Sequence, residues 1–578
     1  GRRASLLATL ITVAIGAAVI FLILRVQREP LPRDDILALV DSFGNGSEIP
    51  WPRVQLSVSS PEGALDSGVL QAFVQHLALE LTAHGVDVSA AERPPVKLMG
   101  LTHCVQASTP DADAGARDEC VASLEELASQ ELDDGGDMST VATFHLLLVP
   151  SEGCSALILD AGTSAVLRWR AAAALAGPSE LASAVAARFK ETWFRELPLW
   201  HGTPLFEIAP SYLFSFSLVG DCGHRASWDF PGGVLLPYLQ RFLGRLQQLF
   251  DLEVDSQVVQ CSALTSKQAG GKWVVDASEL KADFQRYANE WPGDTVTRDA
   301  TWLPPLVRLA AFWPSGKLRV VDDARQQQHS FAVPGWGAVV LAGADDTCKK
   351  VKVCSRPAGS AGENRSIRVL PPCEAQQIAS AWVSHLRAWL TLEPEAPVVT
   401  KSSDAEEGDA KSTCAEDGGL LLLAARPLLD GIARWEQLLV ARVVHALFVR
   451  RAAETLENVQ TMVDSLTELV VKEEIGEMAV EAAAAARRAA SAAKQGNLTD
   501  ALRAARSALQ RALTVSHDET LAADLYFSWE WKWAVRLPIL LPIVVPTVVA
   551  TGRELARVRE SWVLKKQRAV EAATEDVQ

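Results

Sequence analysis

Residues 212–219, YLFSFSLV, decide the fold of this chain because they open a strand–helix–strand unit. The side chains of this run alternate in polarity, as expected of a β-strand. Residues 233–250 then have helical spacing, and residues 254–261, VDSQVVQC, read as a second strand. Strands that alternate with helices predict an α/β fold built in layers.

The same pattern extends toward the N-terminus. Residues 54–60 alternate like a strand, and apolar residues between Leu70 and Leu81 follow at helical spacing, with Gly85 as the expected helix stop. Ser179 is the expected N-cap of an amphipathic helix over 179–193. Short strands at 143–149, 155–160 and 165–169 are expected to form a meander, so we predict mixed sheets.

Downstream, the pattern continues and then becomes helical. Two more strands and one more helix are predicted, at 306–312, 338–341 and 374–392. A polar, acidic linker at 401–419 ends the predicted α/β domain, 28–420. The following segment, 421–520, has an apolar seam from Leu456 to Val470 and an alanine-rich stretch, and Gly496-Asn497 should turn it into a helical hairpin.

Composition limits the class of protein. The chain has 578 residues, 48% hydrophobic and 22% charged, which is a globular balance with a substantial core. A net charge of −16 argues against broad nucleic-acid binding, which needs a basic surface. The nine cysteines form no C-x-x-C pair, and they fit a lumenal domain with a few disulfides whose pairing the sequence leaves open.

A first membrane anchor is predicted at residues 5–24, SLLATLITVAIGAAVIFLIL. Twenty uncharged residues at about 1.5 Å per residue span the hydrocarbon core of a bilayer. A cleaved signal peptide is the rival interpretation. The apolar stretch runs directly into Arg25 without a small-residue cleavage site, and this favours an uncleaved anchor.

A second transmembrane helix is predicted at residues 534–552, with an interfacial helix as the alternative. Pro538, Pro542 and Pro546 recur every four residues on one side of this helix. Each proline removes a backbone hydrogen bond that lipid cannot replace, so that side should face partner helices. Aromatic residues precede the segment, and the tail 553–578 is basic, which predicts a cytosolic C-terminus.

Two spans with a cytosolic C-terminus place both termini in the cytosol and the large region between them in the lumen. Three N-x-S/T sequons in that region are candidate N-glycosylation sites: Asn45, Asn364 and Asn497. The acidic stretch 107–137 is expected to leave the main fold.

The sequence contains no convincing catalytic, cofactor-binding or metal-binding residues. Nucleophile-elbow, zinc-protease, dinucleotide and phosphate-loop motifs do not occur. The segment Asp221-Cys222-Gly223-His224, with Asp229 nearby, is better explained as a connecting loop than as a Cys/His centre. The same holds for His103-Cys104, and carboxylate pairs such as Asp322-Asp323 are typical of solvated turns.

Ordered short matches from about residue 206 to 555 make the chain resemble the PIG-S family, a subunit of the endoplasmic-reticulum GPI transamidase. The three prolines of the second predicted span follow the family's spacing, whereas the stretch 107–137 departs from it. The matching segments include Ser215-Phe216-Ser217-Leu218, Trp228-Asp229, Val254-Asp255-Ser256-Gln257, Trp302-Leu303-Pro304, Pro334-Gly335-Trp336-Gly337, Trp435-Glu436 with Ala441-Arg442, and Leu525-Tyr526-Phe527.

The resemblance implies an accessory, non-catalytic subunit that supports attachment of GPI anchors to the C-terminus of precursor proteins. The implied partners are the caspase-like catalytic subunit PIG-K, PIG-T, PIG-U, the GPAA-type subunit and membrane lipid, with no cofactor. Two other hypotheses remain open. One is a membrane-anchored lumenal enzyme, a hydrolase or transferase with an α/β domain. The other is a membrane-tethered receptor or adhesion module.

Overall fold

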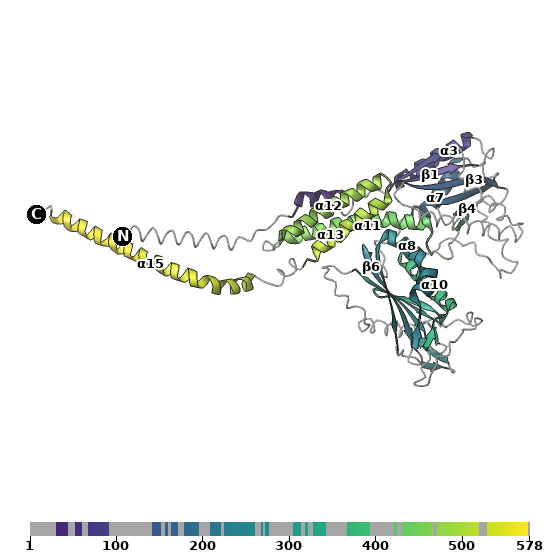
Figure 1. Ribbon diagram of the computed structural model, residues 1–578. Helices are drawn as coiled ribbons and strands as arrows, with labels where there is room; N and C mark the ends of the chain where they lie inside the picture. Colours follow the sequence, from purple (N-terminus) through teal and green to yellow (C-terminus); the bar gives the residue numbers. More distant parts are fainter. Residues whose placement is uncertain are drawn as a thin grey trace, which may run out of the picture. The chain divides into compact units, whose positions relative to one another are not determined.

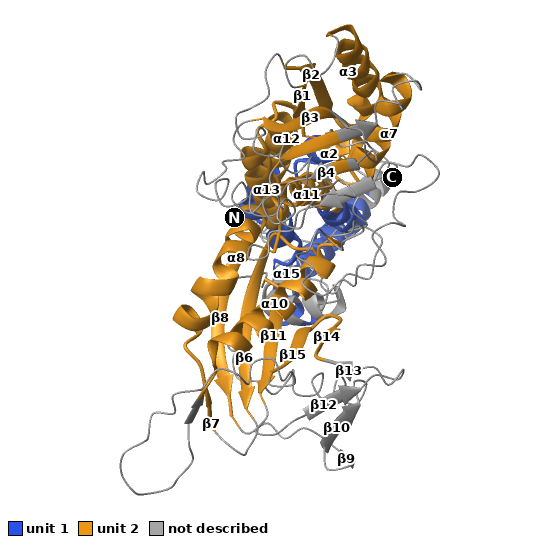
Figure 2. Ribbon diagram, turned by 90° about the vertical axis from the view of Figure 1, so that its right-hand side faces the viewer, with its two compact units in different colours: residues 1–37, 455–481, 512–578 blue, residues 38–454, 482–511 orange. Residues whose placement is uncertain are grey.

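Two compact units make up the chain in a computed structural model (Figure 2). Unit 1 comprises residues 1–37, 455–481 and 512–578, and unit 2 comprises residues 38–454 and 482–511. The structure describes residues 31–43, 52–60, 67–91, 141–151, 156–159, 163–170, 178–195, 208–220, 225–260, 267–269, 272–276, 304–313, 318–321, 327–342, 367–392, 421–424, 431–465, 471–518 and 529–575. The first predicted span, the stretch 107–137 and the linker 401–419 lie outside them.

Unit 2 contains a six-stranded mixed sheet in the order β17-β4-β5-β3-β1-β2 (Figure 1). Only β4 and β5 pair antiparallel; the other neighbours are parallel. Its strands are β1 (Val54–Ser59), β2 (Val86–Ala90), β3 (Ala142–Ser151), β4 (Ala156–Leu159), β5 (Ser164–Arg170) and β17 (Leu421–Ala424).

Two expectations for this sheet need correction. The predicted meander is wrong, because β5 lies between β3 and β4 and runs parallel to β3. A hairpin that folds back in this way lets the apolar β5 occupy a central position. Ser179 is not an N-cap, because α7 (Pro178–Glu191) already begins at Pro178, a residue suited to the first helical turn. β17, just after residue 420, pairs with β4, and the domain boundary at 420 stays a prediction.

Helices α3 (Ser67–Leu81) and α7 pack against each other beside this sheet. α3 continues into the short helix η1 (Thr82–His84), and Gly85 then adopts a left-handed φ of 70°, as predicted for the stop. The ring of Trp193, just after α7, packs with the rings of Phe189 of that helix and Phe144 of β3. The rings of Phe189 and Trp193 are stacked with their centroids 4.5 Å apart. These buried rings fix the end of α7.

A second, five-stranded sheet of unit 2 has the order β14-β15-β11-β6-β8. All neighbours are parallel except β14 and β15. Its strands are β6 (Ser211–Gly220), β8 (Asp251–Val259), β11 (Leu306–Trp313), β14 (Ser330–Val333) and β15 (Gly337–Leu341), so the predicted strand–helix–strand unit is confirmed.

Three helices accompany the second sheet (Figure 1). They are the π-helix η3 (Phe230–Leu239), α8 (Gln240–Leu249) and α10 (Pro372–Trp389). The ring of Phe216 on β6 packs edge-on against Trp382 of α10 at 5.2 Å. Pro237 lies inside η3 and lacks the amide hydrogen of a regular helix, which fits the wider turns there.

Two small sheets complete the described strands. β7 (Arg225–Ser227) pairs parallel with β16 (Ile367–Val369). The other sheet has the order β13-β12-β10-β9, from β9 (Lys267–Ala269), β10 (Lys272–Asp276), β12 (Leu318–Val321) and β13 (Gln327–Gln328). The predicted class, α/β with mixed sheets and C-terminal helices, is therefore confirmed.

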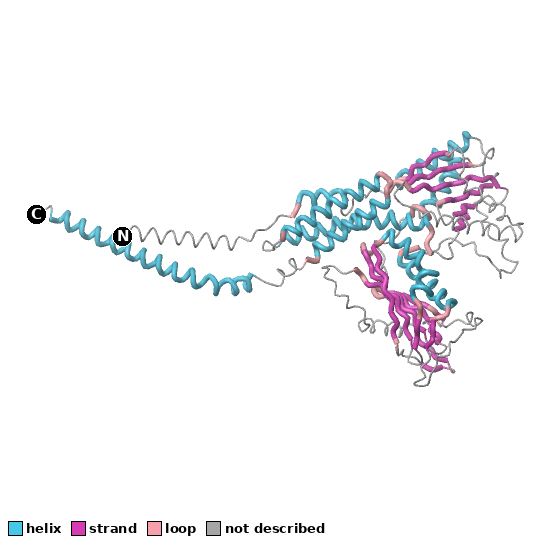
Figure 3. Tube along the Cα trace, viewed as in Figure 1, coloured by secondary structure: helices cyan, strands magenta, loops and turns pink. Residues whose placement is uncertain are grey.

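From α11 onward the described part of the chain is helical, as expected (Figure 3). It contains α11 (Arg434–Ser465), α12 (Glu473–Lys494) and α13 (Leu498–Ser516). The turn between α12 and α13 uses Gly496 at φ 80°, where an added Cβ would lie 2.5 Å from Val141. Glycine is therefore required there both by conformation and by space.

Unit 1 holds the end of α11, the beginning of α12, the end of α13 and α15 (Trp529–Glu575). In it Arg33, at the start of α2 (Arg33–Phe43), pairs with Asp464 at 3.7 Å, with both side chains exposed. The second predicted span, 534–552, lies within α15 and stays a prediction. In the part of the chain that the structure describes, no helix is long and apolar enough to cross a membrane.

Candidate functional site

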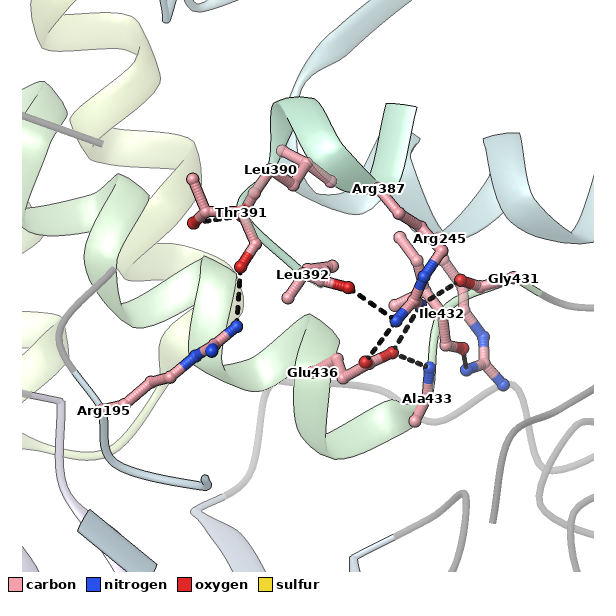
Figure 4. Close-up of polar contacts among 10 residues, drawn as sticks. All are labelled: Arg195, Arg245, Arg387, Leu390, Thr391, Leu392, Gly431, Ile432, Ala433 and Glu436. Atoms are coloured by element: carbon pink, nitrogen blue, oxygen red, sulfur yellow. Dashed lines mark hydrogen bonds and ion pairs between the residues drawn. The ribbon is translucent and has the colours of Figure 1, made fainter. Parts of the chain in front are cut away.

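A partly buried polar cluster lies where α8, α10 and α11 meet in unit 2 (Figure 4). We call it the arginine junction; it consists of Arg195, Arg245, Arg387 and Glu436. Arg245 comes from α8, Arg387 from α10 and Glu436 from the first turn of α11. Arg195 follows α7, so the cluster joins segments that accompany both large sheets.

Arg387 and Glu436 form the centre of the arginine junction. Two guanidinium nitrogens of Arg387 donate to the two carboxylate oxygens of Glu436 at 2.7 and 2.8 Å, a bidentate geometry. Their side chains are only 12% and 10% exposed. Arg387 also donates to the carbonyl oxygens of Gly431 and Leu392. The ion pair thus links α10 to α11, and solvent has little access to either side chain.

The conformation of the segment before α11 positions Glu436 for its ion pair with Arg387. The amide of Ala433 donates to Oε2 of Glu436 at 2.8 Å, so Glu436 closes the first turn of its own helix, as the glutamate of a capping box does. Gly431 has a φ of 66°, and a Cβ there would lie 2.4 Å from Val383 and 2.9 Å from Phe242. Only glycine lets the chain pass this close to α8 and α10.

Arg195 extends the arginine junction toward the six-stranded sheet. It donates to the carbonyl oxygen of Thr391 at 2.6 Å. Thr391 ends α10 with a φ of 57°, a left-handed conformation that is unusual for a residue other than glycine. On the α8 side, Arg245 donates to the carbonyl oxygen of Ile432. Arg195 and Arg245 thus each donate to a backbone carbonyl, as Arg387 does beside its ion pair.

Farther along α11, further side chains bind segments of both sheets. Arg442 is fully buried, donates to the carbonyl oxygen of His84 and lies over the ring of Phe194 at 5.2 Å. Burial lowers the pKa of Arg442 to about 9, which still leaves the guanidinium charged at neutral pH. Arg451 donates to the carbonyl oxygen of Ile208, just before β6, at 2.7 Å. α11 is therefore the element that unites the two sheets.

His445 marks a different contact of α11. It is completely buried, and its Nε2 lies 3.3 Å from the carbonyl oxygen of Ala489 on α12. Desolvation lowers its pKa to about 4 despite this hydrogen bond, so the imidazole is neutral at pH 7. Alanine side chains fill much of the surrounding surface of α12, including Ala482, Ala485, Ala486 and Ala489.

The chemistry of the arginine junction suits it to holding segments in place. Arginine keeps its proton at neutral pH and so cannot serve as a general base. Glu436 already accepts three donors, which engages its oxygens. Within the described residues no group of His, Cys, Asp and Glu side chains could hold a metal ion.

The predicted site residues that the structure describes lie at the start of α13 and on α15. Asn497 is half-buried at the start of α13; its Oδ1 accepts from the Asp500 amide at 3.1 Å, and its Nδ2 donates to the Asp500 carboxylate at 2.7 Å. Pro538 and Pro546 are exposed on α15. Asn45, Asn364 and the side chain of Pro542 lie outside the described residues.

Of the residues considered for chemistry, the structure describes Asp229. Asp229 caps η3 by accepting from the Gly232 amide at 3.1 Å. Residues 221–224, His103-Cys104 and Asp322-Asp323 lie outside the described residues. The arginine junction was missed because its members are far apart in sequence. The only local signal is Glu436 in the first turn, three residues after the N-cap position.

Comparison with known proteins matches residues 7–561 to a family described as PIG-S, phosphatidylinositol-glycan biosynthesis class S protein. Curated relatives are GPI-anchor transamidase component PIGS of Bos taurus, 23% identical over 365 residues, and of Homo sapiens, 22% identical over 365 residues. Each match covers 61% of this chain and 58% of the relative. The matches thus span less than two thirds of these relatives.

The family match includes the segments that build the arginine junction, all of α11 and both large sheets. It extends over nearly the whole sequence rather than over one domain. The chain therefore belongs to the phosphatidylinositol-glycan biosynthesis class S (PIG-S) family.

Proposed function

We propose that this chain is an accessory, non-catalytic component of a GPI transamidase, which supports attachment of GPI anchors to precursor proteins. The family match over residues 7–561 carries the proposal. Relatives from cattle, rat and human, at 22–23% identity, are GPI-anchor transamidase components. An accessory subunit presents surfaces to its partners, which requires a rigid body more than it requires reactive side chains.

The arginine junction supports this role. It ties α10 to α11 and holds Arg195 against Thr391, and Arg451 of α11 adds a bond to the segment before β6, all through charged, partly buried hydrogen bonds. Such bonds keep the geometry of a large scaffold constant while partners bind.

Residence at the endoplasmic-reticulum membrane is part of the proposal. The segment 5–24 serves as one anchor and 534–552 as the other, with both termini cytosolic. Cys373, at the start of α10, is disulfide-bonded, and disulfides persist in oxidising compartments such as the endoplasmic-reticulum lumen. The proline side of the second anchor, which carries Pro538, Pro542 and Pro546, faces partner helices in this arrangement.

The partners in this proposal are PIG-K, PIG-T, PIG-U and the GPAA-type subunit. Depleting the chain in the cells that make it should leave GPI-linked proteins off the surface, with their precursors uncleaved. A tagged chain purified in mild detergent should bring the caspase-like subunit with it. Unchanged surface display together with the absence of that subunit would refute the proposal. Catalytic turnover by the chain alone would support an enzyme instead.

Glycosylation at Asn45, Asn364 and Asn497 is a separate proposal. Removal of N-linked glycans should increase the electrophoretic mobility, and an Asn→Gln change at each used site should remove one step of that shift. A glycan at Asn497 would have to replace the hydrogen bond from Nδ2 to Asp500. An unchanged mobility would exclude glycans at all three positions.

A further inference from the structure

The strand β8 forms an open edge of the five-stranded sheet. It is nine residues long and pairs on one side with β6; within the described residues no strand lies on its other side. Residues 253–256 are exposed at four consecutive positions, so both faces of the strand are open there. The opposite edge differs: β14 has only four residues, and Phe331 and Val333 are buried.

The backbone register of β8 shows which groups point outward. The amide of Asp251 donates to the carbonyl oxygen of Pro210, beside the parallel pairing with β6. Alternation along a strand then directs the N–H and C=O groups of Val254, Ser256 and Val258 away from the sheet. The amide of Ser256 donates to the Asp255 carboxylate at 2.8 Å, a local acceptor on an exposed side chain.

Side chains along this edge divide by face. Val254 and Val258, each 38% exposed, lie in register with Phe214 and Leu218 of β6. Glu253 and Asp255 occupy the other face. Long edge strands usually carry lysine or proline that discourages pairing with other chains, and β8 has neither.

We propose that β8 binds an extended segment of a partner subunit, which adds a strand to the sheet; this rests on the proposed function. The segment alternates apolar residues, which pack on Val254 and Val258, with basic residues, which face Asp255. A carbonyl oxygen of the segment replaces the Asp255 carboxylate on the Ser256 amide, and the carboxylate turns to the basic residue. A second copy of β8 fits poorly, because its own acidic residues would lie opposite these.

The test uses the full chain in its own cells. A photo-crosslinking amino acid at position 254 should capture a subunit of the copurifying transamidase, whereas the same probe at the exposed Leu79 of α3 should not. Capture of a second copy, equal capture at both positions or no capture at 254 would overturn the proposal.

A variant gives an independent measurement. Ser256→Pro removes the outward amide without touching the pairing to β6, and should lower copurification of partner subunits by about tenfold or more. Ser256→Ala keeps the amide and should behave as the original chain. A Ser256→Pro chain that resists proteolysis normally and copurifies at the original level would overturn the proposal. If the original chain copurifies no transamidase subunit, the proposed function fails instead.

Discussion

Helix α11 is held in two different ways along its length. At its start, the arginine junction fixes it by charged hydrogen bonds with defined directions. Farther along, His445 contacts α12 among small alanine side chains that allow close approach. The first contact depends on every partner being present, because a buried charge left alone is costly. The second depends on volume, because close helices have no room for larger side chains.

The largest effect is expected from breaking the arginine junction. Arg387→Met leaves the buried Glu436 without its counter-ion and should lower the free energy of unfolding by about 3–5 kcal/mol. Denaturant unfolding of the full chain in detergent, followed by tryptophan fluorescence, would measure this.

Arg188→Met is the matched control, since Arg188 pairs with Glu191 at an exposed site and should cost at most about 1 kcal/mol. Adding Glu436→Leu to Arg387→Met should recover part of the loss. If Arg387→Met and Arg188→Met lowered the free energy of unfolding equally, burial of the Arg387–Glu436 pair would not explain the effect.

Acidification tests the second contact. The folded pKa of His445, about 4, lies below the ordinary value of 6.5, so the unfolded state binds the proton more readily. The free energy of unfolding should therefore fall as the pH drops from about 6.5 to 4, by up to about 3 kcal/mol. Unfolding curves across this range would show it.

His445→Leu should flatten this dependence, while His76→Leu, at an exposed position on α3, should leave it unchanged. Some slope will remain, because burial also lowers the pKa of His145 and His385. An unaltered slope in His445→Leu would count against a buried neutral imidazole.

Overfilling the alanine contact should have a smaller effect. Ala486 is fully buried on α12, and Ala486→Leu should cost about 1–3 kcal/mol because neighbouring side chains must shift. Val480→Leu, at a position 43% exposed on the same helix, is the control and should be nearly neutral. Thermal unfolding would compare them, and a neutral Ala486→Leu would mean that α12 has spare room.

The smallest effect concerns a directed hydrogen bond at the half-buried Asn497. Asn497→Ala removes the cap of α13 and should cost about 1 kcal/mol, well below the Arg387 variant. Asn497→Asp retains the capping oxygen and should restore most of the stability, as measured by denaturant unfolding. If Asn497→Ala cost as much as Arg387→Met, burial would not be what separates the two kinds of bond.

Local sequence patterns predicted many of the helices and strands, but they did not predict how distant elements pair and pack together. The strand at 54–60, the helix before Gly85, the β6–β8 unit and the turn at Gly496 were foreseen because each depends on neighbouring residues. The place of β5 between β3 and β4 was not, because strand order depends on long-range pairing. Similarly, 49 residues separate Arg387 from Glu436, and nothing in either neighbourhood identifies the other.

The α/β class, the helical C-terminal segment and the resemblance to PIG-S could all be predicted from the amino-acid sequence, because they depend on periodicity and on short motifs in a fixed order along the chain. Only the folded structure shows that α11 contacts segments of both sheets, that Arg387 and Glu436 pair with little exposure to solvent, and that β8 is the edge strand of its sheet among the described residues. Burial and pairing depend on contacts between residues that are distant in sequence, and the spacing of residues along the chain does not reveal these contacts.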